Sequence, residues 1–239
     1  MAEPLLGIVV PAYNEARRIR GTLERLCHFK ERRPYTIELM VVDDGSTDHT
    51  VETVSEFPGI RLVRNDRNHG KGFTVRHGVL EARGEFVLFT DADLSTPIEE
   101  VEKLLSVLQS SGADAAVGSR ALERELIGIH QPWLRETAGR FFNLLVRVFT
   151  GLRLHDTQCG FKLFKRSSTR RAFELMRVEG FGFDPELLFL IERAGGRVVE
   201  VPVRWNDNPA TKVRFLRDST RMFLDLIAIR WRAFMGKYQ

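Results

Sequence analysis

The segment EFVLFTDADLSTP, residues 85–97, joins a short apolar run to a pair of aspartates and a proline. Apolar runs of this length that end in Asp, Gly or Pro are typical of buried parallel strands. Proline is favoured at the first position of a helix, so Pro97 indicates that a helix begins there. We therefore predict a strand over 85–90 that presents Asp91 and Asp93 at its carboxyl end.

Pairs of a predicted strand and a predicted helix also precede and follow this segment. Apolar runs alternate with segments of helical periodicity for about 120 residues, which favours a parallel sheet with helices on both faces. The other strands expected here are 5–10, 37–42, 60–64 and 113–118, and the helices are 16–29, 48–57, 72–82 and 97–110. Asn14 is a plausible cap for the first of these helices.

The alternation becomes irregular after Arg120. We expect helices at 133–150, 167–176, 185–194 and 215–234, a short strand within 157–165 and a strand at 197–205. No repeat, low-complexity tract or linker divides the sequence. We therefore predict one α/β domain over residues 1–239 with a mostly parallel sheet.

The composition narrows the class of protein. For 239 residues, 43% hydrophobic and 28% charged residues predict a globular protein with a full core and exclude disordered or collagen-like proteins. Cys27 and Cys159 lack metal-ligand spacing, and the first residues lack the features of a signal peptide. These features predict a reduced, cytoplasmic setting. The apolar runs are shorter than the roughly 20 residues that cross a bilayer, so we expect no spanning helix.

Polar clusters follow three of the predicted strands, at 11–15, 43–46 and 91–93. In open α/β sheets, ligands bind beyond the carboxyl ends of the strands, so we expect the clusters to converge on one crevice. Asp91 and Asp93 point to the same side in extended geometry. Together with a diphosphate they would suit Mg²⁺ or Mn²⁺. A turn-forming aspartate pair is the alternative interpretation.

Lys71 lies between two glycines in a segment that only superficially resembles a phosphate-binding loop. Neither a Walker A motif nor a dinucleotide-binding fingerprint is present, so ATP hydrolysis and NAD-dependent redox chemistry lose their main support. Lys71 remains either a candidate nucleotide contact or a surface residue.

Six segments are specific when taken in order: VVPAYNE (9–15), VVDDGSTDHT (41–50), NHGKGFTVRHG (68–78), DADLSTP (91–97), GSR (118–120) and DTQCGFKLF (156–164). Together they resemble family-2 glycosyltransferases of the GT-A fold, and above all the transferases that make dolichyl- or polyprenyl-phosphate glucose or mannose. The resemblance covers about residues 5–212. It implies a nucleotide-sugar-binding half (1–120), an acceptor-binding half (121–212) and an amphipathic, membrane-associating helix (213–239).

The resemblance also implies roles on the donor side. The residues expected to contact the nucleotide are Pro11, Tyr13, Glu15, Asp43, Asp44, Lys71 and Asp91. Asp91 and Asp93 are the expected ligands of Mg²⁺ or Mn²⁺, and Asp93 is also a catalytic candidate. Ser95 stands where some relatives have glutamine, so we leave it out of the ligand shell.

The acceptor phosphate needs cations, and the planar guanidinium of arginine suits phosphate oxygens. The candidates for this contact are Arg120, Arg135, Arg140 and Lys212. Asp156 is the second catalytic candidate, but its role is open. A hydroxyl acceptor would need a carboxylate to take its proton, whereas a phosphate is largely ionised at neutral pH and can attack without a base. Asp156 could then position groups, or simply cap a turn.

The expected function is a metal-dependent, inverting transfer of a hexose from a nucleotide sugar to dolichyl or polyprenyl phosphate. UDP-glucose is the favoured donor and GDP-mannose the other. A glycan hydroxyl as acceptor and a non-catalytic nucleotide-sugar binder are the alternatives. Residues 212–239 hold seven basic and two acidic residues, and the last helix mixes these with apolar residues. This pattern favours peripheral binding to the cytoplasmic face of a membrane, with no nucleic-acid partner. A solvated helix face is the plainer interpretation.

Overall fold

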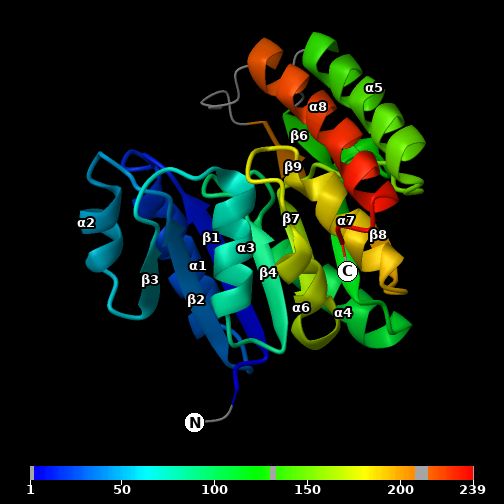
Figure 1. Ribbon diagram of the computed structural model, residues 1–239. Helices are drawn as coiled ribbons and strands as arrows, with labels where there is room; N and C mark the ends of the chain where they lie inside the picture. Colours follow the sequence, from blue (N-terminus) through cyan, green and yellow to red (C-terminus); the bar gives the residue numbers. More distant parts are fainter. Residues whose placement is uncertain (1–2, 130–132, 208–214, 239) are drawn as a thin grey trace.

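The computed structural model describes residues 3–129, 133–207 and 215–238 of the chain (Figure 1). Each predicted helix and strand has a counterpart, with small differences at the ends. In chain order, the elements are β1 (Leu6–Ala12), α1 (Ile19–Glu31), β2 (Ile37–Asp43), α2 (Thr50–Ser55), β3 (Ile60–Arg64), α3 (Lys71–Glu81), β4 (Phe86–Thr90), the 3₁₀ turn η1 (Ile98–Glu100), α4 (Val101–Ser111), β5 (Ala115–Ser119), η2 (Arg124–Leu126), β6 (Ile127–Ile129), α5 (Trp133–Thr150), β7 (Phe161–Lys165), α6 (Arg166–Leu175), α7 (Phe183–Arg193), β8 (Val198–Pro202), β9 (Trp205–Asn206) and α8 (Phe215–Phe234).

The central sheet has seven strands in the order β3-β2-β1-β4-β7-β5-β8. Its strands pair in parallel except β7, which runs antiparallel to both β4 and β5. The predicted, mostly parallel sheet is therefore confirmed, although the periodicity did not indicate the reversed strand. A second, two-stranded sheet of β6 and β9 was also not expected, because strands this short carry no alternation that a sequence pattern can reveal.

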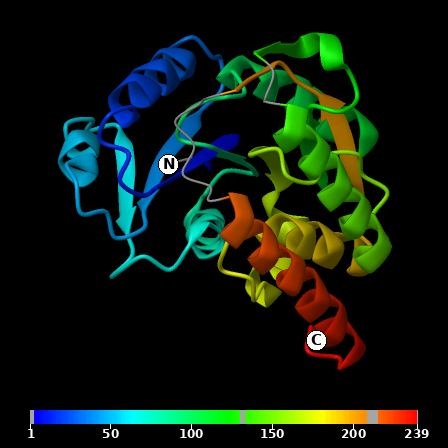
Figure 2. The same ribbon diagram turned by 90° about the horizontal axis from the view of Figure 1, so that it is seen from above.

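Strand β4 lies at the centre of the domain and is buried along its whole length. Its side chains alternate between two apolar clusters, with Leu88 on one face and Val87 and Phe89 on the other. Helices α1 and α4 supply the first cluster, whereas α3, α6 and α7 supply the second. Figure 2 shows α1 and α3 on opposite sides of the strands. Burial on both faces explains why the run is continuously apolar.

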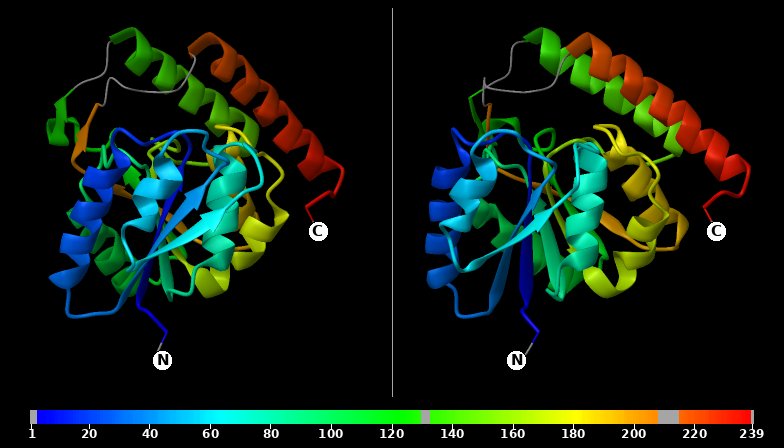
Figure 3. Two further views of the ribbon diagram at one scale, coloured as in Figure 1. Left: turned by 90° about the vertical axis from the view of Figure 1, so that its left-hand side faces the viewer. Right: turned by 60° about the vertical axis from the view of Figure 1, so that its left-hand side comes forward.

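Helices α5 and α8 lie side by side on one end of the domain (Figure 3). The rings of Phe149 and Phe223 meet edge to face between them, with centroids 6.0 Å apart. The end of α8 is tied to the core through Glu186, which is fully buried and accepts hydrogen bonds from Tyr238 and Arg232. Within the described ranges, no helix has both the length and the apolar character needed to span a bilayer.

The predicted cap at Asn14 is wrong. Helix α1 begins at Ile19, and Arg18 occupies its N-cap without a side-chain hydrogen bond. Asn14 has a left-handed φ of 53°. Its Oδ1 accepts a hydrogen bond from the Thr47 amide at 2.8 Å. Asn14 therefore joins the loops that follow β1 and β2, which is a tertiary contact that helix-capping rules do not address.

Close packing of α3 on the sheet gives a test of this arrangement. A Cβ at Gly78 would lie 2.4 Å from Val9 Cγ1 and 2.7 Å from Val42 Cγ2. We expect Gly78→Ala to lower the free energy of unfolding by about 1–3 kcal/mol, because the helix must move away from the sheet. Gly21 in α1 has no atom within 4 Å of its Cβ position. Gly21→Ala is therefore the matched control and should raise the free energy of unfolding by roughly 0.5–1 kcal/mol. Urea denaturation measures both changes, and equal stability of the two variants would contradict the packing.

Candidate active site

The reversed direction of β7 brings its first residues to the carboxyl end of β4. Phe161 pairs with Thr90 across the two strands, and the Asp91 amide donates to the Gly160 carbonyl at 3.1 Å. A Cβ at Gly160 would lie only 1.8 Å from Asp91 Oδ2. Glycine thus lets the Asp91 carboxylate lie directly against the backbone of the 154–160 loop.

A lysine from α3 faces the same carboxylate. Lys71 Nζ lies 2.6 Å from Asp91 Oδ1. The same ammonium lies over the ring of Phe89, 5.3 Å from its centroid. The structure therefore places Lys71 and Asp91, both predicted nucleotide contacts, in one cluster.

Asp93 contacts Arg18, the N-cap residue of α1. Its Oδ1 accepts from the Ser95 amide at 3.0 Å, and its Oδ2 lies 3.6 Å from Arg18 Nη1. Arg18 also donates to Glu15 through Nη2 at 2.8 Å. In addition, the Thr22 hydroxyl donates to the carbonyl that lies between the two aspartates. Glu15 and Asp93 are thus linked through one arginine that the sequence analysis did not single out.

The donor set at Asp91 and Asp93 suits a hard divalent cation, because carboxylate oxygens are the ligands that Mg²⁺ and Mn²⁺ prefer. Across the part of the chain that the structure describes, no third His, Cys, Asp or Glu completes a metal-holding cluster with them. A cation bound by these two carboxylates would complete its coordination with oxygens of the predicted diphosphate. The close approach of Gly160 keeps the Asp91 carboxylate in a fixed position for that contact.

The two aspartates after β2 have different surroundings. Asp43 accepts a hydrogen bond from the Ser46 amide at 3.1 Å and closes its own turn. Asp44 accepts from Asn65 Nδ2 at 2.8 Å and from the amides of His69 and Gly70 at 3.0 and 2.8 Å. The Asp44 carboxylate therefore shapes the loop that leads into Lys71.

Pro11 and Tyr13 lie at the same edge of the sheet, where β1 ends. Pro11 lies in β1 and is half-buried, whereas 38% of Tyr13 is exposed. The amide of Glu15 donates to Thr50 Oγ1 at 2.7 Å, so the loop after β1 is fixed against α2. All three predicted nucleotide contacts thus lie at the carboxyl end of β1.

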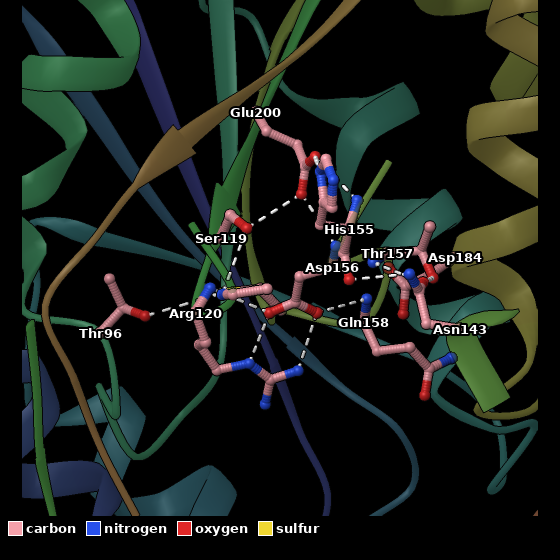
Figure 4. Close-up of polar contacts among 12 residues, drawn as sticks. Thr96, Ser119, Arg120, Asn143, His155, Asp156, Thr157, Gln158, Asp184 and Glu200 are labelled. Carbon is pink, nitrogen blue, oxygen red and sulfur yellow. Dashed lines mark hydrogen bonds and ion pairs between the residues drawn. The ribbon is translucent and has the colours of Figure 1, made fainter. Parts of the chain in front are cut away.

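Arg120 and Asp156 form a two-pronged ion pair beside this edge (Figure 4). Arg120 Nε and Nη2 donate to Asp156 Oδ2 and Oδ1 at 2.6 and 2.9 Å, and the Arg120 amide donates to Oδ2 at 3.1 Å. Burial raises the pKa of Asp156. The charge and hydrogen bonds of Arg120 lower this pKa by more than burial raises it, so the net shift is downward. The carboxylate is therefore ionised at neutral pH. The stabilisation by this pair is lost only as the pH falls through that lowered pKa.

The charge of Asp91 also affects the pKa of Arg120. Burial lowers the pKa of Arg120, whereas the charges of Asp156 and, to a smaller extent, Asp91 raise it, with a net upward shift. The charge of the predicted metal ligand therefore favours the ionised form of the predicted phosphate-binding arginine.

Several supporting residues were missed by the sequence analysis. Glu200 in β8 accepts hydrogen bonds from Ser119 Oγ and from the amides of His155 and Asp156. Asn143 in α5 donates to the carbonyl of His155 and accepts from Thr157. These residues come from three distant parts of the chain, so no local motif could connect them.

Two further residues of the DTQCGFKLF segment support the site. Lys162 is fully buried, and its Nζ lies 2.6 Å from Asp184 Oδ1. In the described part of the chain, Gln158 Nε2 is buried without a hydrogen-bond partner. Since buried amides rarely stay unpaired, Gln158 is a candidate donor to a ligand oxygen.

The structure describes the side chain of only one of the other three predicted phosphate-binding residues. Arg140 is exposed on α5. Arg135 belongs to α5, but its side chain lies outside the described part of the chain, and so does the whole of Lys212. The structure thus brings Arg120 and Asp156 together with Asp91, whereas the roles of Arg135, Arg140 and Lys212 stay predictions.

Comparison with known proteins identifies the family. Residues 7–173 match Glycosyl transferase family 2. The dolichyl-phosphate beta-glucosyltransferase of Trichomonas vaginalis is 40% identical over 247 residues, which cover 97% of this chain and 73% of that protein. The protein of the same name from Saccharomyces cerevisiae is 34% identical over 259 residues, which cover 99% of this chain and 77% of that protein.

Solved structures confirm the fold. Glucosyl-3-phosphoglycerate synthase from Mycobacterium tuberculosis, in complex with Mn²⁺, uridine diphosphate and glucosyl-3-phosphoglycerate, matches with a TM-score of 0.68 at 20% identity. The match covers 95% of this chain and 80% of that chain. The α/β domain with its mostly parallel sheet therefore has the predicted GT-A fold. The chain belongs to glycosyl transferase family 2 and is a glycosyltransferase.

Proposed function

We propose that this glycosyltransferase moves glucose from UDP-glucose to dolichyl or polyprenyl phosphate, with inversion, in a reaction that requires Mg²⁺ or Mn²⁺. The observation that carries the proposal is the hydrogen bond from the Asp91 amide to the Gly160 carbonyl, because it joins the predicted metal ligand to the loop whose Asp156 holds Arg120, the predicted phosphate-binding residue. The relatives named dolichyl-phosphate beta-glucosyltransferase support the acceptor and the sugar. GDP-mannose remains the alternative donor.

On the donor side, Asp91 and Asp93 would hold the cation, and the 1–120 half would hold the nucleotide. When bound, a divalent cation neutralises the charge that develops on the departing nucleoside diphosphate. The structure of the Mycobacterium tuberculosis synthase with Mn²⁺ and UDP-glucose supports this assignment. Pro11, Tyr13, Glu15 and Asp43 would contact the base and ribose, and Asp44 would act by shaping the loop before Lys71.

On the acceptor side, Arg120 would orient the lipid phosphate, whose oxygen attacks the anomeric carbon as the nucleoside diphosphate leaves. The phosphate is largely ionised at neutral pH and needs no base. Asp156 would therefore hold the guanidinium in place, as its two-pronged contact suggests. Arg135, Arg140 and Lys212 would add positive charge in the 121–212 half.

Two other functions compete with this proposal. A glycan hydroxyl as acceptor would require Asp156 to take a proton, but Arg120 occupies both of its oxygens and stabilises its ionised form. A non-catalytic nucleotide-sugar binder would have no need for the paired carboxylates Asp91 and Asp93. Neither alternative fits the described contacts as well.

The lipid acceptor requires contact with a membrane surface, and we assign this contact to α5 and α8. Their exposed apolar side chains are Phe141, Leu144 and Val148 on α5, and Leu224, Ile227, Trp231 and Phe234 on α8. Arg221 and Arg230 are exposed on α8 as well. A helix pair with apolar and basic side chains on its surface suits the plane of an anionic bilayer, such as the cytoplasmic face of a cell membrane.

The donor and the metal are tested together with radiolabelled sugar nucleotides and dolichyl phosphate. We expect lipid-linked glucose from UDP-glucose in Mg²⁺ or Mn²⁺, much less product from GDP-mannose, and none with a chelator. Asp91→Asn should lower kcat by about 10²–10³-fold, because the site loses a ligand of the cation that stabilises the leaving group. Glucosyl transfer that persists in chelator would refute the metal dependence, and transfer only to a glycan hydroxyl would refute the acceptor.

The role of Asp156 is tested by Asp156→Asn. If the carboxylate only positions Arg120, we expect the KM for dolichyl phosphate to rise by about tenfold with a smaller fall in kcat, because one charged contact is weakened. Glu24→Gln, on the exposed side of α1, is the control and should leave both constants unchanged. A fall in kcat of about 10³-fold with intact donor binding would instead favour a catalytic base.

Membrane binding is tested by flotation with vesicles of anionic phospholipid. The wild-type protein should float at low salt and less at high salt, because screening weakens the contribution of the arginines. The double variant Ile227→Glu/Trp231→Glu should bind at least about tenfold more weakly, since two apolar side chains leave the interface. Ser110→Glu, at an exposed position of α4, is the control. Wild-type protein that stays out of the vesicle fraction at low salt would overturn the assignment.

A further inference from the structure

Each of the two candidate metal ligands already has a cation of this chain beside it. Lys71 Nζ lies 2.6 Å from Asp91 Oδ1, and Arg18 Nη1 lies 3.6 Å from Asp93 Oδ2. The Lys71 contact is short enough to take up one carboxylate oxygen. A divalent cation at Asp91 would therefore meet an ammonium group on the same carboxylate.

The backbone that carries Lys71 is fixed on both sides. The amides of Gly72 and Phe73 donate to the Glu179 carbonyl at 2.7 and 3.2 Å, and the Gly70 amide donates to Asp44. Gly70 has a φ of 109°, and a Cβ there would lie 2.5 Å from the Glu179 carbonyl oxygen. The main chain cannot withdraw easily, so only the flexible side chain of Lys71 can exchange one partner for another.

A second ion pair limits the choice of partners for Lys71. Asp184, whose charge also acts on Lys71, is already paired with Lys162 at 2.6 Å. Lys162 lies over the ring of Phe89 at 5.8 Å, and Lys71 lies over the same ring at 5.3 Å. The two ammonium groups and two carboxylates balance each other. A divalent cation added at Asp91 would repel Lys71, whereas a diphosphate would offer it new oxygens.

We propose that Lys71 and the divalent cation compete for Asp91, so that the cation binds weakly alone and tightly together with the nucleoside diphosphate, which takes up the Lys71 ammonium. The inference rests on the metal site of the proposed function. It makes Lys71 the group that couples metal binding to donor binding. The direction of the coupling follows from charge: Lys71 opposes the metal at Asp91 and favours the diphosphate.

The test measures Mn²⁺ binding directly, from the electron paramagnetic resonance signal of free Mn²⁺, with and without UDP. Lys71→Met keeps the length of the side chain and removes its charge. Without UDP, we expect this variant to bind Mn²⁺ about tenfold more tightly than the wild type does. In saturating Mn²⁺, its affinity for UDP should fall by about tenfold, because the diphosphate loses a cationic partner. Opposite shifts in the two affinities are the signature of competition.

Lys103→Met is the matched control, because Lys103 forms a comparable ion pair at 2.7 Å, but with Glu100 rather than with a candidate metal ligand. It should change neither affinity. Lys71→Arg keeps the charge and should stay close to the wild type without UDP. If Lys71→Met binds Mn²⁺ no more tightly than the wild type, while the wild type binds Mn²⁺ and UDP together, the competition is refuted and the proposed function stands. If the wild type binds no Mn²⁺ even with UDP, the metal dependence of the proposed function fails instead.

Discussion

The antiparallel pairing of β7 between β4 and β5 is the constraint on which the site depends. A parallel strand in this position would begin at the opposite edge of the sheet and carry the 154–160 loop away from Asp91. Because β7 is reversed, Phe161 lies opposite Thr90, and the loop before it meets the carboxyl ends of β4 and β5. Donor-side and acceptor-side residues from distant parts of the sequence thus reach one edge of the sheet.

Paired charges then give this edge its chemistry. The Lys162–Asp184 pair is buried next to the ring of Phe89, and removing one partner of such a pair typically costs about 3–5 kcal/mol. Nearer the surface, Lys71 pairs with Asp91 and Arg120 with Asp156. Among the described residues, each of these charged groups has a partner from the chain itself. Because these charges are already paired within the chain, the desolvation cost of burying them together is limited. A ligand that binds here would replace one of these internal partners.

The sequence predicted those parts of the site that depend on local patterns. Asp91 follows a continuously apolar run, and such a run specifies a buried strand and the loop at its end. The direction of β7 could not be predicted in this way, because a short apolar run indicates a strand but not whether that strand pairs in parallel or antiparallel. Glu200 and Asn143 were missed because they act through contacts between distant elements. The cap assigned to Asn14 was wrong for the same reason, since a tertiary contact competed with the local one.

The links around Asp156 also connect helix α5, to which the membrane contact was assigned, with the predicted acceptor site. Asn143 lies in α5, the helix that exposes Phe141 and Leu144, and its amide nitrogen donates to two successive carbonyls of the 154–160 loop at 3.0 and 2.7 Å. Its oxygen accepts from Thr157, so every polar atom of the side chain binds that loop. Asp156 in the loop in turn holds the Arg120 guanidinium. The helix face assigned to the membrane and the arginine assigned to the lipid phosphate are therefore separated by only two side-chain contacts. If the proposed membrane contact forms, the helix that makes it also sets, through Asn143 and Asp156, the position of the arginine assigned to the lipid phosphate.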